Sequence, residues 1–178
     1  MTVKYPQEPL FIAEVAYPHG AGRIGVTPCP GRPEGFFGRQ RDLEADLRCL
    51  SDWGATRMLT LLEDHELAFA DLEHLGERVS AHAMHWQHLP IIDHAAPGNR
   101  FEAAWPIVGP GLHEHLSNGG RVVIHCWAGI GRSATVAARL LVEAGVAPRD
   151  AVALLRTVRP GAVEVEEQYE HLVWVAGG

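Results

Sequence analysis

The stretch that most restricts the fold lies between residues 122 and 145, where an apolar run passes through a glycine-rich loop into a helical pattern. Residues 122–124 (VVI) are β-branched and typical of a strand. The loop HCWAGIGR follows, and residues 133–144 then have the composition of a helix that closes at Gly145. A strand, a short loop and a helix in this order favour an α/β fold.

The rest of the chain repeats this alternation. Apolar residues recur at steps of three and four from Leu43 to Trp53, after a capping Asp42 and before Gly54, which predicts a helix. The other expected elements are strands at Arg57–Leu62 and Met84–Ile92 and helices at Leu67–Val79, Trp105–Leu116 and Arg149–Val158, with a tight turn at 117–120. We therefore predict a central, mainly parallel sheet flanked by helices.

The length predicts a single domain. A chain of 178 residues is large enough for one hydrophobic core, and we expect residues 1–178 to form one domain. Residues 17–41 are too rich in Gly and Pro for a long helix, so we interpret residues 1–41 as an irregular entry segment, with Arg23–Thr27 as a candidate short strand.

Charge and cysteine content exclude several classes of partner. The net charge of -7, with no basic run, argues against binding to nucleic acid or to an acidic membrane surface. No segment approaches the ~20 apolar residues of a membrane-spanning helix, and the first residues lack the apolar core of a signal peptide, so we expect a cytoplasmic protein. The 3 cysteines have wide, irregular spacings, which argues against a disulfide framework and leaves thiol chemistry open.

The loop after the 122–124 strand has the features of an anion site beside a reactive cysteine. Backbone N–H groups at a helix start are unpaired and carry partial positive charge, and the glycines let them converge on one point. The residues expected to bind phosphate are Trp127, Ala128, Gly129, Ile130, Gly131 and Arg132. Arg132 can hold two phosphate oxygens with its planar guanidinium. The same groups stabilise a thiolate at Cys126, which would make it a nucleophile.

Two neighbours of this loop are assigned supporting roles. His125 can orient the loop through hydrogen bonds to backbone carbonyls, and the Ser133 hydroxyl can donate to the sulfur when it leaves. Taken singly, a buried cysteine is usually a small hydrophobe and a glycine-containing loop is a weak signal. The combination of Cys126 with two loop glycines, Arg132 and a hydroxyl favours the functional interpretation.

The histidines do not predict a metal site. His82, His85 and His88 are three residues apart, so they would alternate between the faces of a strand and could not converge on one ion. His113 and His115 are interpreted as partly exposed polar residues. Phosphoryl chemistry by cysteine needs no metal, and we expect no cofactor.

The run HCWAGIGRS resembles the signature loop of the protein tyrosine and dual-specificity phosphatase superfamily, whose pattern is His-Cys, two residues, Gly, two residues, Arg, then Ser or Thr. Longer stretches are similar to kinase-associated phosphatases and their bacterial dual-specificity relatives: DLRCLSDWGATRMLTLLEDHEL, LPIIDHAAP, IHCWAGIGRSATVAARLL and LRTVRPGAVEVEEQY. The resemblance implies a phosphatase that hydrolyses phosphate monoesters through a phosphocysteine intermediate.

The resemblance also implies a second catalytic residue. In the family, an Asp on a movable loop upstream of the signature protonates the leaving oxygen and later deprotonates the hydrolytic water, and LPIIDHAAP has Asp93 at that position. Family members commonly hold this water with a Gln, where this chain has Glu164; Gln168 matches a different, later Gln. Three roles for Glu164 stay open: it positions the water, it turns outward, or it slows dephosphorylation of the cysteine. An ordinary solvated glutamate at the start of a helix explains its presence equally well.

The implied substrates are phosphorylated proteins. No segment resembles the tyrosine-selecting loop of the larger phosphatases, so we expect a shallow pocket that accepts phosphoserine, phosphothreonine and phosphotyrosine. Two alternatives stay open: a phosphatase of small-molecule or lipid phosphates with the same machinery, and a phosphate-binding module with weak turnover, for which Glu164 is the one hint.

Overall fold

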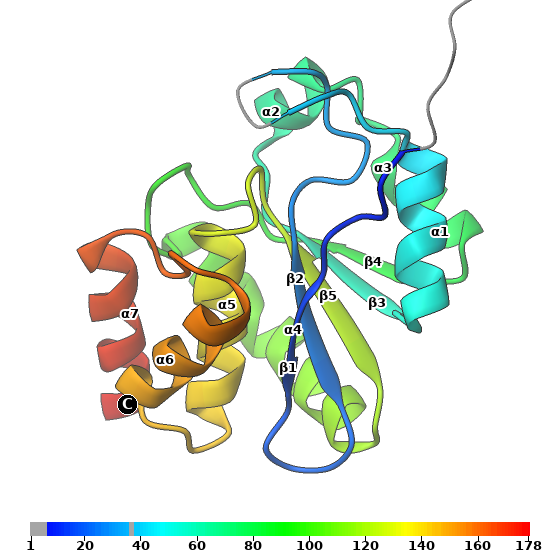
Figure 1. Ribbon diagram of the computed structural model, residues 1–178. Helices are drawn as coiled ribbons and strands as arrows, with labels where there is room; N and C mark the ends of the chain where they lie inside the picture. Colours follow the sequence, from blue (N-terminus) through cyan, green and yellow to red (C-terminus); the bar gives the residue numbers. More distant parts are fainter. Residues whose placement is uncertain (1–6, 36–37) are drawn as a thin grey trace, which may run out of the picture.

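The computed structural model describes residues 7–35 and 38–178, which form a five-stranded sheet with helices on both faces (Figure 1). The strands are β1 (Ala13–Ala16), β2 (Arg23–Thr27), β3 (Arg57–Thr60), β4 (His85–His88) and β5 (Arg121–His125). They lie in the order β1-β2-β5-β3-β4, and only β1 runs antiparallel to its neighbour. The predicted fold class, a mainly parallel sheet flanked by helices, is confirmed.

The helices cover the two faces of this sheet unequally. They are α1 (Leu43–Trp53), α2 (Asp64–Phe69), α3 (Leu75–Ala81), α4 (Asn99–Ser117), α5 (Arg132–Glu143), α6 (Pro148–Val158) and α7 (Glu166–Gly177). Helices α1 and α3 cover one face, whereas α4 to α7 lie on the other (Figure 1). The short α2 lies beyond the end of the sheet.

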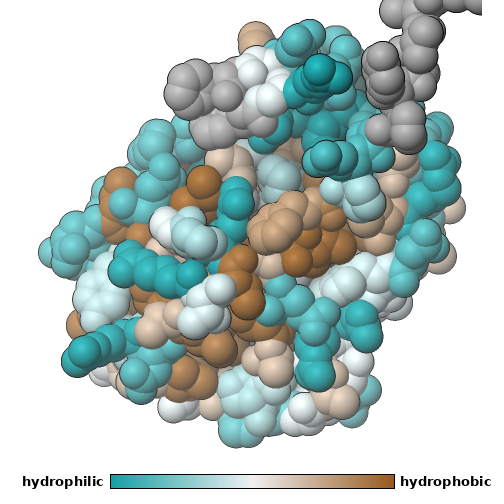
Figure 2. Space-filling model, in the orientation of Figure 1, coloured by the Kyte–Doolittle hydropathy of each residue, from teal (hydrophilic) through white to brown (hydrophobic). Residues whose placement is uncertain are grey.

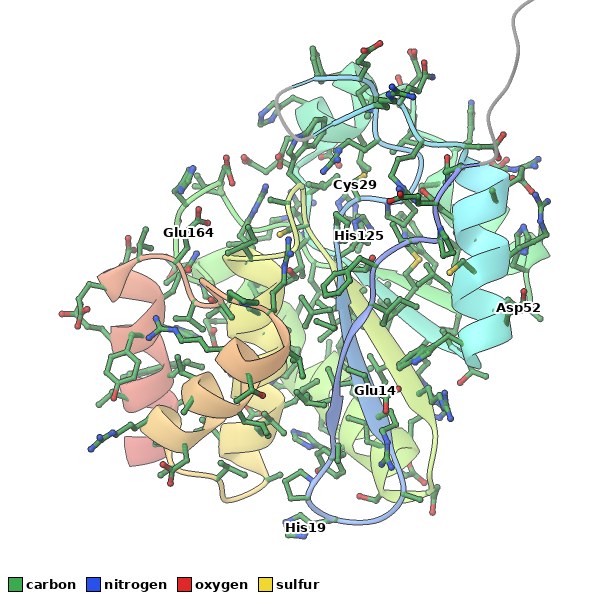
Figure 3. All side chains as sticks on the ribbon, viewed as in Figure 1. Glu14, His19, Cys29, Asp52, His125 and Glu164 are labelled. Atoms are coloured by element: carbon green, nitrogen blue, oxygen red, sulfur yellow. The ribbon has the colours of Figure 1, made fainter. Side chains whose placement is uncertain are left out.

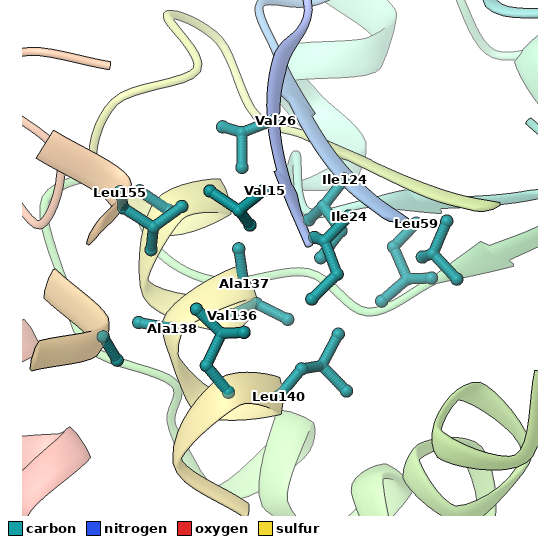
Figure 4. Packing of buried hydrophobic residues seen from close by; sticks show 14 of the residues in the cluster. Val15, Ile24, Val26, Leu59, Ile124, Val136, Ala137, Ala138, Leu140 and Leu155 are labelled. Carbon is teal, nitrogen blue, oxygen red and sulfur yellow. The ribbon is translucent and has the colours of Figure 1, made fainter. Parts of the chain in front are cut away.

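Strand β5 explains why the apolar run at 122–124 is continuous. Val122 and Ile124 belong to the hydrophobic cluster under α4 to α7, and Val123 belongs to the cluster under α1 and α3. Figure 4 shows Ile124 and its neighbours on the sheet facing Val136 and Leu140 of α5. Full burial of each such side chain stabilises the fold by roughly 1.5–3 kcal/mol, so both faces of the strand hold it in place.

The entry segment is more ordered than its composition predicts. The candidate strand at Arg23–Thr27 is confirmed as β2. Strand β1 was not expected, so the description of this segment as irregular is wrong for residues 13–16. Strand β1 is short, and its ladder partner is β2 alone, with Ala13 opposite Val26. Tertiary pairing rather than local propensity therefore forms it. Residues 1–6 and 36–37 of the segment lie outside the described residues.

The helix predicted over Leu67–Val79 is wrong, because the structure has two short helices there, α2 and α3. Asp71 between them has a left-handed backbone with φ 55°, which no helix continues through. Helix α4 also begins at Asn99, well before the expected Trp105, and α7 had no predicted counterpart. The helices predicted after Asp42, after Gly131 and before Pro160 are found nearly where they were expected.

The parallel strands bring three loops to one edge of the sheet. In the ladders His125 lies opposite both Thr27 and Thr60, so β2, β3 and β5 all end at this edge, which is where ligands bind in most open α/β sheets. The surface in Figure 2 is largely hydrophilic with separate hydrophobic patches. Within the described residues, no helix combines the length and apolar character needed to cross a membrane.

Candidate active site

The loop of residues 126–131 turns all its carbonyl groups away from its own centre. Each carbonyl accepts a hydrogen bond: Cys126 O from His125 Nδ1 (3.4 Å), Trp127 O from Cys29 N–H (3.1 Å), Ala128 and Gly129 O from Arg159 (2.7 and 2.8 Å), Ile130 O from Val163 N–H (3.1 Å), and Gly131 O from Thr135 N–H (2.9 Å). Because a peptide N–H points opposite to its C=O, the N–H groups turn inward. Such a ring of N–H groups at the start of α5 is an anion site.

Arg159, at the end of α6, holds two of these carbonyls with one guanidinium. Its Nε donates to Gly129 O and its Nη2 to Ala128 O, while the ring of Phe11 lies 5.3 Å from its central carbon. Burial lowers the pKa of this guanidinium. Arg159 therefore braces the outside of the loop.

The two glycines of the loop, Gly129 and Gly131, are required by different steric constraints. Gly129 has φ 69°, and a Cβ there would lie 2.6 Å from the backbone carbon of Thr27. Gly131 has an ordinary φ, but a Cβ there would lie 2.6 Å from Glu164 Oε2. The first glycine is needed for the turn of the loop and the second for the close approach of Glu164.

Cys126 and Ser133 are neighbours at the base of this loop. The cysteine is only 3% exposed, and its Sγ lies 3.2 Å from Ser133 Oγ, within hydrogen-bonding range for sulfur. Ser133 is in the first turn of α5, where the helix dipole favours a negative charge. The hydroxyl is therefore well placed to donate to a sulfur anion.

Arg132 is buried, and a carboxylate that the sequence did not reveal holds its orientation. Nη1 and Nη2 donate to Glu66 at 2.6 and 2.9 Å, and Nη1 also donates to Ile91 O at 3.1 Å. Burial opposes the charge of Arg132 and is the largest single effect, but the hydrogen bonds to Glu66 and the negative charges around the guanidinium together outweigh it and raise its pKa. Glu66 lies on α2, far away in sequence, and no local pattern distinguishes it from other helix-start glutamates.

Asp93 lies on the 89–98 loop, beyond β4, and its carboxylate reaches the same arginine. Its Oδ1 is 2.9 Å from Arg132 Nη2, while the side chain is 59% exposed. The carboxyl group is thus beside the anion site and open to an incoming molecule. The structure brings the predicted Asp93, Cys126 and Arg132 together from separate elements.

His125 is buried behind the loop and stays neutral. Burial lowers the pKa of its imidazole to about 3. Its Nδ1 faces Cys126 O and must carry the proton, so its Nε2 accepts a hydrogen bond from the Thr60 hydroxyl at 2.7 Å. Thr60 Oγ1 in turn accepts from Trp86 Nε1 at 2.8 Å. This series of hydrogen bonds fixes the imidazole against the carbonyl of Cys126.

Glu164 turns toward the loop rather than outward. It follows Val163, whose φ of 59° is rare for a β-branched residue, and its carboxylate lies against Gly131. Its Oε2 is also 3.9 Å from Nδ1 of His94 on the 89–98 loop. In Figure 3 Glu164 is labelled on the segment before α7, whereas His125 and Cys29 lie at the ends of β5 and β2.

An exposed aromatic ring stands beside the loop on the side of α2. The Phe69 ring centroid lies 6.0 Å from that of Trp127, the residue after Cys126, and Phe69 is 74% exposed. The same short helix carries Glu66, so the ring and the arginine's partner belong to one element. No pattern in the sequence distinguishes Phe69, which falls inside the longer helix expected at Leu67–Val79.

The remaining candidates give no second centre. Cys29, Cys49 and Cys126 are free, and burial raises the pKa of the Cys29 thiol. Nowhere in residues 7–35 and 38–178 do three or more His, Cys, Asp or Glu side chains gather in a way that would hold a metal ion. His113 instead bonds Glu143, and His88 bonds the carbonyl of Leu62.

Comparisons with known proteins agree with this geometry. Residues 34–146 match the model of a family described as a phosphatase of the DSP-PTPase type in polymorphic toxin systems. The chain is 29% identical over 152 residues to cyclin-dependent kinase inhibitor 3 of Rattus norvegicus, an alignment that covers 84% of this chain and 69% of the relative.

Solved structures share both the fold and part of the sequence. Kinase associated phosphatase, with its catalytic cysteine replaced by serine, has a TM-score of 0.82 at 26% identity, covering 94% of each chain. Tk-PTP in its active form has a TM-score of 0.66 at 28% identity, covering 89% of this chain and 92% of the other.

Proposed function

Because the chain belongs to this family of cysteine-dependent dual-specificity phosphatases, we propose that it hydrolyses phosphate monoesters through a phosphocysteine intermediate formed on Cys126. The observation that carries this proposal is the outward orientation of every carbonyl in residues 126–131. The inward N–H groups and Arg132 would bind a phosphate dianion directly above the sulfur. By this geometry the binding N–H groups would be those of residues 127–132, the same residues that the sequence predicted to bind phosphate.

In the first step the Cys126 thiolate attacks phosphorus. The sulfur–phosphorus bond forms while the bond from phosphorus to the ester oxygen breaks, and the leaving oxygen takes a proton from Asp93. Arg132 and the loop N–H groups stabilise the charge on the other three phosphoryl oxygens. The role of Asp93 is supported by its exposed carboxylate, 2.9 Å from Arg132.

In the second step water attacks the phosphocysteine. The new phosphorus–oxygen bond forms, the sulfur leaves as a thiolate that accepts a hydrogen bond from Ser133, and the Asp93 carboxylate takes the proton of the water. We assign Glu164 to orienting this water by accepting a hydrogen bond from it. This role is supported by the position of Glu164 Oε2 against Gly131, next to the phosphate site. His125 keeps the carbonyl of Cys126 directed away from the phosphate.

For the substrate we propose a phosphorylated protein, with phosphotyrosine included among its targets. The similar structure of kinase associated phosphatase supports a protein substrate, because that protein is named for its association with a kinase. On this chain the exposed Phe69 beside Trp127 supports an aromatic leaving group, because ring contacts of this kind are worth roughly 0.5–1.5 kcal/mol beyond burial.

We also propose that the whole chain is one catalytic domain and that it works in a reducing compartment such as the cytoplasm, which suits its free thiols.

A substrate panel tests this function. Purified protein is assayed on matched phosphotyrosine, phosphoserine and phosphothreonine peptides, on nucleotides and on phosphoinositides, with Cys126→Ser as the inactive control. We expect peptide hydrolysis that is lost in Cys126→Ser, and a preference for phosphotyrosine that falls roughly three- to tenfold in Phe69→Ala but not in Trp174→Ala, which truncates an exposed aromatic on α7. Turnover of phosphoinositides or nucleotides alone would reject the protein substrate, and activity that survives in Cys126→Ser would reject the mechanism.

A further inference from the structure

Gln168, on the first turn of α7, is a buried polar side chain whose role in the proposed mechanism is still open. It is fully buried, although glutamine is mostly an exposed residue. Its Oε1 accepts hydrogen bonds from the N–H groups of Glu164 (2.9 Å) and Val165 (3.4 Å), and its Nε2 donates to Ala95 O at 3.2 Å. One amide therefore connects the segment that carries Glu164 with the loop that carries Asp93.

The orientation of this amide is determined by its partners. Two backbone N–H groups face one end and a carbonyl faces the other, so only one assignment of oxygen and nitrogen satisfies all three. The bonds to Glu164 and Val165 cap the start of α7, which is an ordinary structural role. The bond to Ala95 is not part of the cap, because Ala95 belongs to a different loop.

The 89–98 loop is held on each side of Asp93 by a different residue. Before Asp93, Arg132 donates to Ile91 O at 3.1 Å, and this residue belongs to the phosphate site. After Asp93, Gln168 donates to Ala95 O. The His94 contacts with Asp93 and Glu164, at 3.8 and 3.9 Å, lie between exposed groups and add little by comparison. Gln168 is thus the buried side chain that holds this loop after Asp93, from a position beside Gly131.

Both segments that Gln168 joins carry unusual backbone. His94 has φ 57° and Val163 has φ 59°, a left-handed conformation that costs a non-glycine residue energy. Such a conformation persists only where the surroundings fix it. Gln168 makes a hydrogen bond next to each of these residues, to Ala95 and to Glu164, so it is the side chain that connects the two strained positions.

We propose that Gln168 is a positioning residue, which holds the 89–98 loop so that the Asp93 carboxyl meets the oxygen of the leaving group. The inference rests on the proposed function of Asp93 as the general acid. It predicts that loss of the bond to Ala95 weakens only the part of catalysis that Asp93 supplies, and leaves phosphate binding and attack by Cys126 in place.

Two substitutions separate this role from helix capping. Gln168→Glu keeps an oxygen for the N–H groups of Glu164 and Val165 but sets a second oxygen against Ala95 O. Gln168→Met removes both sets of bonds without adding charge. An effect common to both variants reports the bond to Ala95, and Glu167→Gln, at an exposed position on the same turn, is the matched control.

Each variant is assayed on p-nitrophenyl phosphate, whose leaving group needs little protonation, and on phenyl phosphate, whose leaving group needs an acid. We expect kcat/KM on phenyl phosphate, which reports the step that cleaves the ester, to fall roughly tenfold or more in both Gln168 variants, because a displacement of about 1 Å is enough for such losses. The kcat/KM on p-nitrophenyl phosphate should fall less than about threefold, and inhibition by vanadate should be unchanged in Gln168→Met. In an Asp93→Asn background Gln168→Met should have no further effect on phenyl phosphate.

Equal losses on the two esters in both variants, or losses that multiply with those of Asp93→Asn, would overturn the proposal and leave Gln168 a helix cap. Thermal unfolding of each variant checks that the fold is intact, and if Gln168→Met does not fold, Gln168→Glu alone decides. A failure of the proposed function looks different: Asp93→Asn itself would then slow both esters equally, whatever the Gln168 variants do.

Discussion

Arg132 illustrates how a buried charge becomes usable for binding. It is 2% exposed, and Glu66 accepts hydrogen bonds from two of its nitrogens. A buried guanidinium without a negative partner would destabilise the fold, so Glu66 stabilises it. The same hydrogen bonds fix the orientation of the Arg132 guanidinium.

Replacing Glu66 with Ala tests this double role. We expect the free energy of unfolding to fall by roughly 3 kcal/mol, because one partner of a buried ion pair is removed, and phosphate to bind more weakly because the fork of Arg132 is no longer oriented. Chemical unfolding and inhibition by inorganic phosphate measure the two effects. Glu44→Ala, which breaks an exposed ion pair with Arg78, is the matched control and should cost less than about 1 kcal/mol. Equal effects of the two substitutions would contradict the assignment.

Among the elements, the loop between β5 and α5 depends on a single backbone conformation at Gly129. Alanine there would have to adopt φ 69° and push against the backbone of Thr27 and Pro28. We expect Gly129→Ala to reduce stability by about 2 kcal/mol or more and to abolish phosphate binding, because the N–H groups no longer converge.

The control for this prediction is Gly98→Ala. Gly98 precedes α4, has φ -100°, and an added Cβ would meet nothing within 4 Å. This variant should bind phosphate as the unmodified chain does, in isothermal titration. Unchanged phosphate binding in Gly129→Ala would contradict the account of the loop.

The elements that the sequence predicted well are those whose signals are local. Examples are the β-branched run of β5, the glycines after it and the capping Asp42 of α1, each of which favours its local structure without help from distant residues. The elements it missed depend on distant partners: β1 exists because β2 pairs with it, and α2 separates from α3 because Asp71 adopts a left-handed turn. The same distinction holds for the site. Asp93 could be predicted because the segment around it resembles a known family. The contacts of Glu66 and Gln168 join residues far apart in the sequence, so no short pattern predicts them.

For the molecule as a whole, buried histidines make the fold sensitive to acid. Burial lowers the pKa of His115, His125 and His171, and that of His125 to about 3. The folded state therefore keeps His125 neutral below pH 6.5, where the unfolded chain takes up a proton. Stability from this group is fully present above the unfolded pKa and is lost as pH falls toward 3.

We expect the free energy of unfolding to decrease between pH 6.5 and 4.5, with His125 alone contributing roughly 1.4 kcal/mol per pH unit. Urea unfolding at several pH values measures the slope. His125→Gln should flatten it, whereas His85→Gln, at an exposed position, should not. A slope that is unchanged in His125→Gln would show that the imidazole is not held neutral.

The most direct test of the whole account is to trap the intermediate. The protein is mixed with an aryl phosphate, quenched rapidly in acid and digested, and the peptide that contains residues 126–132 is analysed by mass spectrometry. The account predicts one added phosphoryl group on Cys126, present in larger amount in Asp93→Asn because dephosphorylation lacks its base, and absent in Cys126→Ser. Turnover without any phosphoryl group on this peptide, or with the group on another residue, would contradict it.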